Sequence, residues 1–255
     1  MIRRTYIQQK VLEVYRMFPQ LDFPFDIFSA ISKMKNCRFI SYQDCMKVTG
    51  YTLEDVMGFC QSKSGCTRYD VKYDRYVIYC NLADDIPVGR KLWTAAHELG
   101  HVKLEHLTDE TLAQIAENNL DKASCSATFE READLFAATI LAPFPLFGEF
   151  DVRTDSDVRD IFSLSIEASK IRIEEYYKWK RNHVKTAWEN DLLRLYRYGN
   201  HSPVEGCVGE AKSYVSSSAW VSAPRFYEIG DFADDYPEFP PHLFDNSNTP
   251  TSLQE

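Results

Sequence analysis

Apolar positions at helical spacing dominate most of the chain and predict a succession of helices. Within residues 1–20, for example, Ile7, Val11 and Val14 fall on one side of a helix that Pro19 would end. The same spacing predicts further helices over residues 25–36, 53–60, 88–105, 110–119, 127–141, 155–180 and 183–198.

Three short segments carry the β-branched and aromatic residues that strands prefer. Residues 38–42 are predicted to form one strand, and residues 67–73 and 75–80 a hairpin that turns at Asp74. A small sheet among many helices makes an α+β fold.

Composition changes along the chain and suggests three regions. We expect a main domain over residues 1–150 and a helical region over residues 151–200, for which a helix-turn-helix is one interpretation. Residues 201–255 are expected to form a linker and an acidic, proline-rich tail.

Charge and cysteine content narrow the possible functions. The net charge of -9 argues against a general nucleic-acid binder, because phosphate recognition needs surplus Lys and Arg. The most apolar stretch, residues 135–148, is too short to cross a membrane, and the first residues lack the apolar run of a signal peptide. The seven cysteines include no Cys-x-x-Cys pair, so we expect reduced thiols and a cytoplasmic location.

The string HELGH at residues 97–101 lies inside a predicted helix. His97 and His101 are four residues apart and project from the same helix face, so both imidazoles can reach one metal ion. Glu98 is displaced around the helix axis and is therefore placed to act as a base beside the ion rather than as a ligand. Taken alone, the string also fits a surface helix that carries two histidines.

A zinc ion held by two histidines needs a third protein ligand, with its fourth position left open. Glu130, on the helix predicted over residues 127–141, is the best candidate, and Glu132 is the alternative. Asp134 lies one turn beyond Glu130 and is placed to accept a hydrogen bond from a ligand histidine, which would fix the orientation of that ring. A site of two histidines and one glutamate suits Zn²⁺ best.

Small residues on the two predicted helices support this pairing. Ala133 and Ala137 opposite Gly100 would let the helices approach closely. Glycine inside a helix costs about 1 kcal/mol relative to alanine, and close packing is a physical reason to tolerate it.

The strings TAAHELGH at residues 94–101, EREADLFAA at 130–138 and LAP at 141–143 resemble the ImmA/IrrE family of metallopeptidases. The resemblance extends from about residue 76 to residue 143, and residues 157–179 weakly resemble the helical region that follows in that family. It implies a zincin-like, gluzincin-type peptidase in which His97, His101 and Glu130 bind zinc. It also implies Glu98 as the base and Asp134 behind a histidine.

Characterised members of this family cleave helix-turn-helix repressors, so the resemblance implies a protein substrate of that kind and release of a mobile-element, prophage or stress-response gene set. Two alternatives from other classes remain: a metal-binding regulator that acts by contact, and a DNA-binding factor that uses basic residues between 157 and 197. An intact Glu98 favours the peptidase over the first. For the basic residues between 157 and 197, we favour a solvated, charged helix face over a DNA-binding surface.

Zincin clefts commonly bind substrate as an added strand, and residues 75–81 are our candidate for the sheet edge that receives it. Tyr76 and Tyr79 are then the candidate substrate-binding side chains, although an internal strand fits the pattern equally well. Tyr73, Tyr76, Tyr79 and His106 are all candidates for stabilising the oxyanion.

Overall fold

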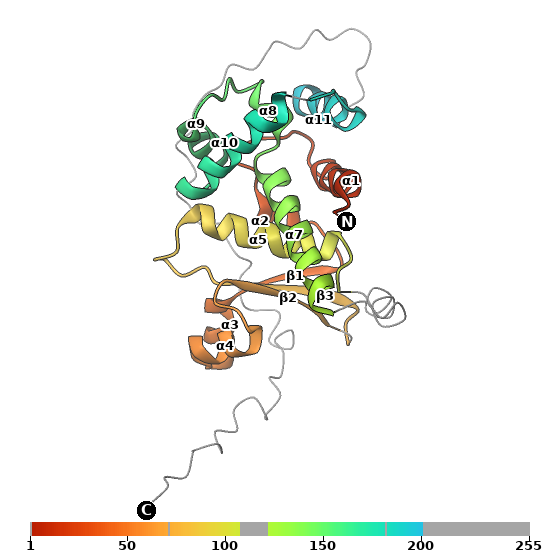
Figure 1. Ribbon diagram of the computed structural model, residues 1–255. Coiled ribbons are helices and arrows are strands. Elements are labelled where there is room, and N and C mark those ends of the chain that lie inside the picture. Colours follow the sequence, from red (N-terminus) through yellow and green to blue (C-terminus); the bar gives the residue numbers. More distant parts are fainter. Residues whose placement is uncertain (1, 71, 108–121, 182, 201–255) are drawn as a thin grey trace, which may run out of the picture.

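The chain folds around a small mixed sheet with helices on both faces (Figure 1). The computed structural model describes residues 2–70, 72–107, 122–181 and 183–200. The strands are β1 (Cys37–Ser41), β2 (Gly65–Asp70) and β3 (Arg75–Cys80), and they lie in the order β1-β3-β2. β1 runs parallel to β3, and β2 runs antiparallel to it. The predicted α+β class and the predicted hairpin are confirmed.

β3 is the central strand, and both of its faces are buried. Tyr76, Ile78 and Cys80 belong to the larger hydrophobic cluster, whereas Val77 and Tyr79 belong to a smaller one on the other face of the sheet. The prediction that this segment forms an open sheet edge is therefore wrong, because β2 and β1 are the outer strands. The nearly continuous apolar run of β3 is typical of a strand covered on both sides.

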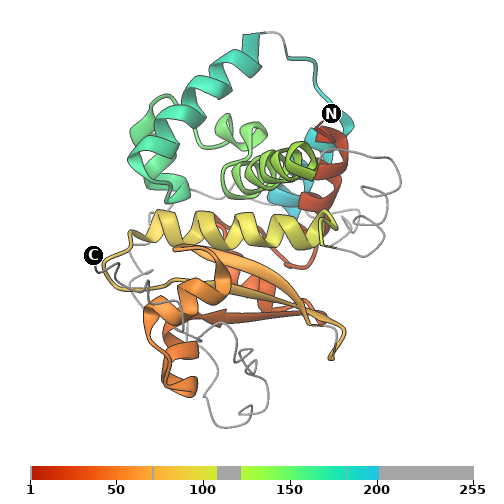
Figure 2. The same ribbon diagram turned by 60° about the horizontal axis from the view of Figure 1, so that its bottom comes forward.

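Helices cover the sheet in layers (Figure 2). α5 lies across one face of the sheet with α7 packed on its far side, and α3 and α4 lie beyond the other face. The helices in the described residues are α1 (Arg4–Tyr15), α2 (Ile27–Ser32), α3 (Tyr42–Thr49), α4 (Leu53–Cys60), α5 (Val88–Lys103), α7 (Lys122–Leu141), α8 (Phe144–Phe147), α9 (Asp155–Phe162), α10 (Ile166–Arg181) and α11 (Ala187–Tyr198).

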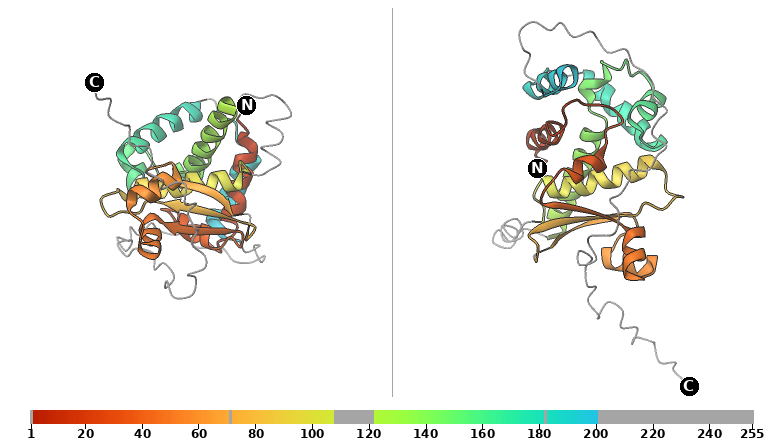
Figure 3. Two further views of the ribbon diagram at one scale, coloured as in Figure 1. Left: turned by 90° about the horizontal axis from the view of Figure 1, so that it is seen from below. Right: turned by 180° about the vertical axis from the view of Figure 1, so that it is seen from behind.

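The early and late helices share one core. α1 packs against both α7 and α11, so helices from the two ends of the described chain lie side by side (Figure 3). A single hydrophobic cluster accordingly includes residues from Ile7 to Leu195. α11 thus helps to bury α1, which in turn packs against α7.

Most predicted helices are present, with differences at particular places. The run predicted over residues 155–180 is divided into α9 and α10 at Ser163, whose φ of 54° ends α9. Gly89 at the start of α5 packs here, since a Cβ at that position would lie 2.7 Å from the Ser163 carbonyl oxygen. α3 and α8 were not predicted, and the helix predicted over residues 110–119 lies outside the described residues.

No helix among the described residues combines the length and the apolar character needed to cross a membrane.

α5 and α7 are in close contact at Gly100. A Cβ atom at this position would lie 3.1 Å from the Ala133 Cα and 3.3 Å from the Phe136 Cβ. Both neighbours belong to a packed helix and cannot move independently. The contact therefore accounts for a glycine in the middle of α5, as the sequence predicted.

We expect Gly100→Val to lower the free energy of unfolding by about 1–3 kcal/mol, because the added side chain must push α7 away. Chemical denaturation followed by circular dichroism measures this change. Gly58 in α4 is the matched control, since it is exposed and a Cβ there meets nothing within 4 Å. Gly58→Val should change stability by less than about 0.5 kcal/mol, and an equal loss in both variants would contradict the packing argument.

Candidate metal centre

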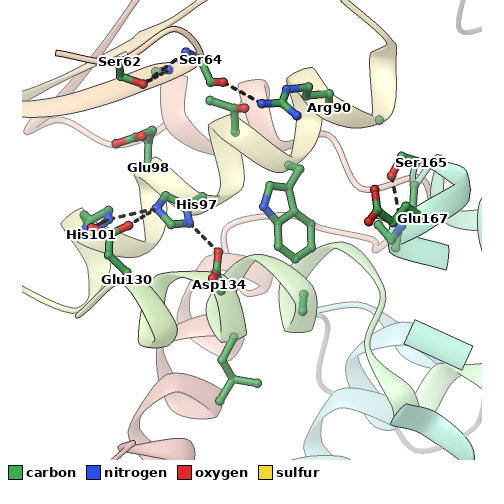
Figure 4. A pocket seen from close by; sticks show the side chains of 18 of the residues that line it. Ser62, Ser64, Arg90, His97, Glu98, His101, Glu130, Asp134, Ser165 and Glu167 are labelled. Carbon is green, nitrogen blue, oxygen red and sulfur yellow. Dashed lines mark hydrogen bonds and ion pairs between the residues drawn. The ribbon is translucent and has the colours of Figure 1, made fainter. Parts of the chain in front are cut away.

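Three side chains from two helices converge at the site (Figure 4). His97 and His101 lie one turn apart on α5, and their Nε2 atoms are 3.2 Å apart. Glu130 on α7 completes the group, with Oε2 3.2 Å from His97 Nε2 and Oε1 3.5 Å from His101 Nε2. Among the described residues, these three form a group whose ligand atoms all lie within 4.8 Å of one another.

These separations suit a tetrahedral metal ion. Nitrogen and oxygen ligands about 2.0–2.1 Å from a tetrahedral zinc ion lie about 3.3 Å from one another. The three measured separations, from 3.2 to 3.5 Å, are close to that value. The three residues could therefore hold such an ion without large movements of either helix.

Asp134 supports His97 from behind. The His97 Nδ1 atom lies 3.0 Å from Asp134 Oδ1, so the ring donates from Nδ1 and keeps the Nε2 lone pair for a metal. Burial lowers the pKa of His97, but the hydrogen bond to Asp134 and the charge of Glu98 outweigh it, and the net shift is upward. Burial and the neighbouring His97 lower the pKa of His101 to about 3, which keeps that ring neutral.

Glu98 lies beside this group but faces the sheet. Its side chain is largely buried, and Oε2 accepts a hydrogen bond of 2.8 Å from the Thr67 hydroxyl on β2. Burial raises the pKa of Glu98, and the Thr67 hydrogen bond only partly opposes that shift. Thr67 was not identified from the sequence. Its 31-residue separation from Glu98 leaves no local pattern that could reveal the contact.

The group lines a cleft of about 1450 Å³ between the sheet and the later helices. β2 contributes one wall through Gly65, Cys66 and Thr67, and α7 contributes Glu130 and Asp134. The far end is formed by Ser165 and Glu167 at the start of α10 (Figure 4). The cleft is long enough to extend well beyond the three converging side chains.

A family model for M78 peptidases, described as the IrrE N-terminal-like domain, matches residues 59–185. The chain belongs to the ImmA/IrrE family of metallopeptidases. The match starts in α4, includes α5 and α7, and ends after α10, so it extends beyond the resemblance found at the two motifs. The small sheet with its two central helices is the zincin-like core that the resemblance implied. A search of curated proteins found no match to the chain.

The two predicted substrate-binding residues need correction within this family fold, and the alternative ligand lies away from the two histidines. Tyr76 and Tyr79, predicted to bind substrate, are buried on opposite faces of β3 and do not line the cleft. Glu132, the alternative ligand, is buried on another side of α7 and pairs with Arg3. It is two residues from Glu130 and therefore lies almost half a turn around the helix.

The oxyanion candidates are not brought to the cleft either. His106 is buried behind His101, and Tyr73 is exposed at the far end of the β2–β3 hairpin. Neither lines the cleft, and the same holds for Tyr76 and Tyr79. The cleft lies on the side of α5 that faces α7. The hairpin tyrosines do not reach it, because their direction is set by the alternation of side chains along the strands.

Losing a residue that only supports a ligand weakens metal binding by about 10–100-fold. We expect Glu130→Ala to weaken it further, because this variant removes one of the three candidate ligands. Metal content after dialysis, measured by plasma mass spectrometry, is the test. Glu167→Ala removes another exposed carboxylate of the same cleft and should leave metal content unchanged. Full metal content in the Glu130 variant would remove this residue from the ligand set.

Thr67→Val should lower kcat by about 10–100-fold, because a hydrogen bond to a charged group contributes about 1.5–3 kcal/mol. The metal ligands are untouched, so metal content should stay at the wild-type level. Thr67→Ser keeps the hydroxyl and should retain most activity. Equal activity in the Val and Ser variants would show that this hydrogen bond does not orient Glu98.

Proposed function

We propose that the protein is a zinc-dependent endopeptidase that acts in the cytoplasm. His97, His101 and Glu130 hold the ion, and Glu98 is the general base. The observation that supports this assignment best is the position of Glu98: it is buried beside the three ligands, in the cleft, and oriented by a residue of the adjacent strand. A protein that only bound metal would not need a carboxylate held in this way.

Zinc bound at this site would polarise the scissile carbonyl and make a water molecule more acidic. The protein's own contribution is proton transfer by Glu98, which accepts the proton of the attacking water and passes it to the leaving amine. Thr67 occupies Oε2, so we assign the transferred proton to Oε1. The raised pKa of Glu98 favours uptake of that proton. Asp134 keeps His97 in the tautomer that leaves Nε2 available.

We assign substrate binding to the outer edge of β2. β2 is an edge strand, and its residues Gly65, Cys66 and Thr67 line the cleft. An extended peptide can add to such an edge through main-chain hydrogen bonds. A peptide bound along Thr67 would pass close to Glu98, because the Thr67 hydroxyl contacts that carboxylate directly.

The substrate class follows from the family. We propose that the protein cleaves a helix-turn-helix transcriptional repressor and thereby releases a mobile-element, prophage or stress-response gene set. The partner is then a protein rather than a nucleic acid, which agrees with the net charge of -9.

The test is co-expression with a helix-turn-helix repressor, taken first from among the genes that neighbour its own. The wild-type protein should produce a discrete cleavage product, and Glu98→Gln should reduce its formation by at least about 10²–10⁴-fold, because the general base is lost. Metal content of the variant should equal that of the wild type. Normal cleavage by Glu98→Gln would refute the assignment of the base, and the absence of any cleavage by the wild type would refute this substrate.

A further inference from the structure

A row of buried polar side chains extends from the back of His101. The His101 Nδ1 atom lies 3.1 Å from His106 Nδ1, and His106 Nε2 lies 3.2 Å from Glu132 Oε2. His106 is 2% exposed and Glu132 is 1% exposed, so water does not compete for these contacts. Burying such groups is costly unless each has a partner. The cost suggests that the row has a purpose beyond packing.

Arg3 holds the far end of the row. Its Nη2 atom lies 2.6 Å from Glu132 Oε2, and its backbone N–H donates to Glu132 Oε1 at 2.7 Å. The carboxylate is therefore satisfied on both oxygens and keeps its negative charge next to the guanidinium. The His106 ring is also stacked on Phe129, with centroids 4.4 Å apart and an interplanar angle of 15°. Both His106 and Glu132 are thus held in one orientation.

The contacts determine the tautomers of both rings when these are neutral. Arg3 Nη2 also lies 3.3 Å from His106 Nε2, but its two hydrogens are directed to Glu132 Oε2 and to the Leu104 carbonyl oxygen. The Glu132 carboxylate only accepts hydrogen bonds, so His106 carries its proton on Nε2 and donates it to Glu132. His106 Nδ1 is then an acceptor, and His101 must donate to it from its own Nδ1. His101 is consequently left with its lone pair on Nε2, the atom that faces His97 and Glu130.

We propose that His106 and Glu132 are positioning residues that fix the tautomer and orientation of the ligand His101, with Arg3 holding Glu132 in place. The inference rests on the proposed metal site and is independent of the substrate. Each ligand histidine then has carboxylate support: Asp134 acts on His97 directly, whereas Glu132 acts on His101 through the intervening ring of His106.

The experiment compares zinc affinity in variants that separate this role from packing. His106→Phe keeps a ring that can stack on Phe129 but removes both hydrogen bonds. His106→Asn supplies an amide oxygen in place of the Nδ1 acceptor. Glu132→Gln keeps an acceptor but removes the charge.

The matched control is His183→Phe. His183 also pairs with a buried glutamate, since its Nε2 lies 2.6 Å from Glu189 Oε2, and it stacks on Trp179 with centroids 3.8 Å apart. It does not line the cleft.

Zinc Kd is measured by competition with a chelator, together with the visible spectrum of the cobalt-substituted protein and the Tm of the metal-free protein. We expect His106→Phe to raise the zinc Kd by about 10–100-fold and to alter the cobalt spectrum. Glu132→Gln should raise the Kd less than His106→Phe, and His106→Asn should recover most of the affinity. His183→Phe should leave the Kd and the spectrum unchanged even if its Tm falls.

An unchanged zinc Kd in His106→Phe would overturn the proposal and leave the row a purely structural feature, whatever happens to Tm. A wild-type protein that binds no zinc would overturn both this inference and the proposed function. A wild-type protein that binds zinc but cleaves no repressor would contradict only the proposed substrate, and the affinity measurements would still decide the role of His106.

Discussion

The contact between α5 and α7 at Gly100 is the constraint on which the site depends. A Cβ at Gly100 would lie 3.1 Å from the backbone of α7, so the two helices meet here without a side chain of α5 between them. At this separation a carboxylate from α7 reaches two imidazoles on α5, with ligand atoms 3.2 to 3.5 Å apart. Glutamate has a short side chain, and a wider spacing of the helices would leave Glu130 out of reach. Gly100 therefore sets both the packing of the two helices and the distance over which Glu130 reaches the two imidazoles.

Elements that are distant in sequence each hold a different side chain of the site. α7 provides the proposed ligand Glu130 on one side and, through Glu132, a buried anchor on another side, while β2 orients the proposed base Glu98 through Thr67. Arg3 connects the first described residues to this arrangement. His101 is thus held by buried contacts, and His97 is held by the more exposed Asp134. Side chains that are already oriented reduce the reorganisation needed for an ion to bind.

Much of the fold could be predicted because its signals are local. The spacing of apolar residues predicted α4 with its correct bounds, and the apolar and aromatic residues of β3 predicted a strand. α3 was missed although Ser41 caps it through the Asp44 N–H and Gly50 ends it at a φ of 76°, because its own apolar face is short. The edge assignment failed for a different reason. The pattern of a strand reflects its burial, whereas the residues that pair with β3 lie 5 to 39 residues away along the chain.

By itself, the sequence determined that His97 and His101 share a helix face with Glu98 displaced beside them, because helical periodicity depends only on neighbours along the chain. It also narrowed the third ligand to two glutamates on one helix. Only the tertiary structure decided between them. α7 turns Glu130 toward α5 and buries Glu132 against Arg3 and His106, and β2 brings Thr67 to Glu98. These contacts depend on how whole helices and strands pack, and the spacing of residues within one element does not contain that information.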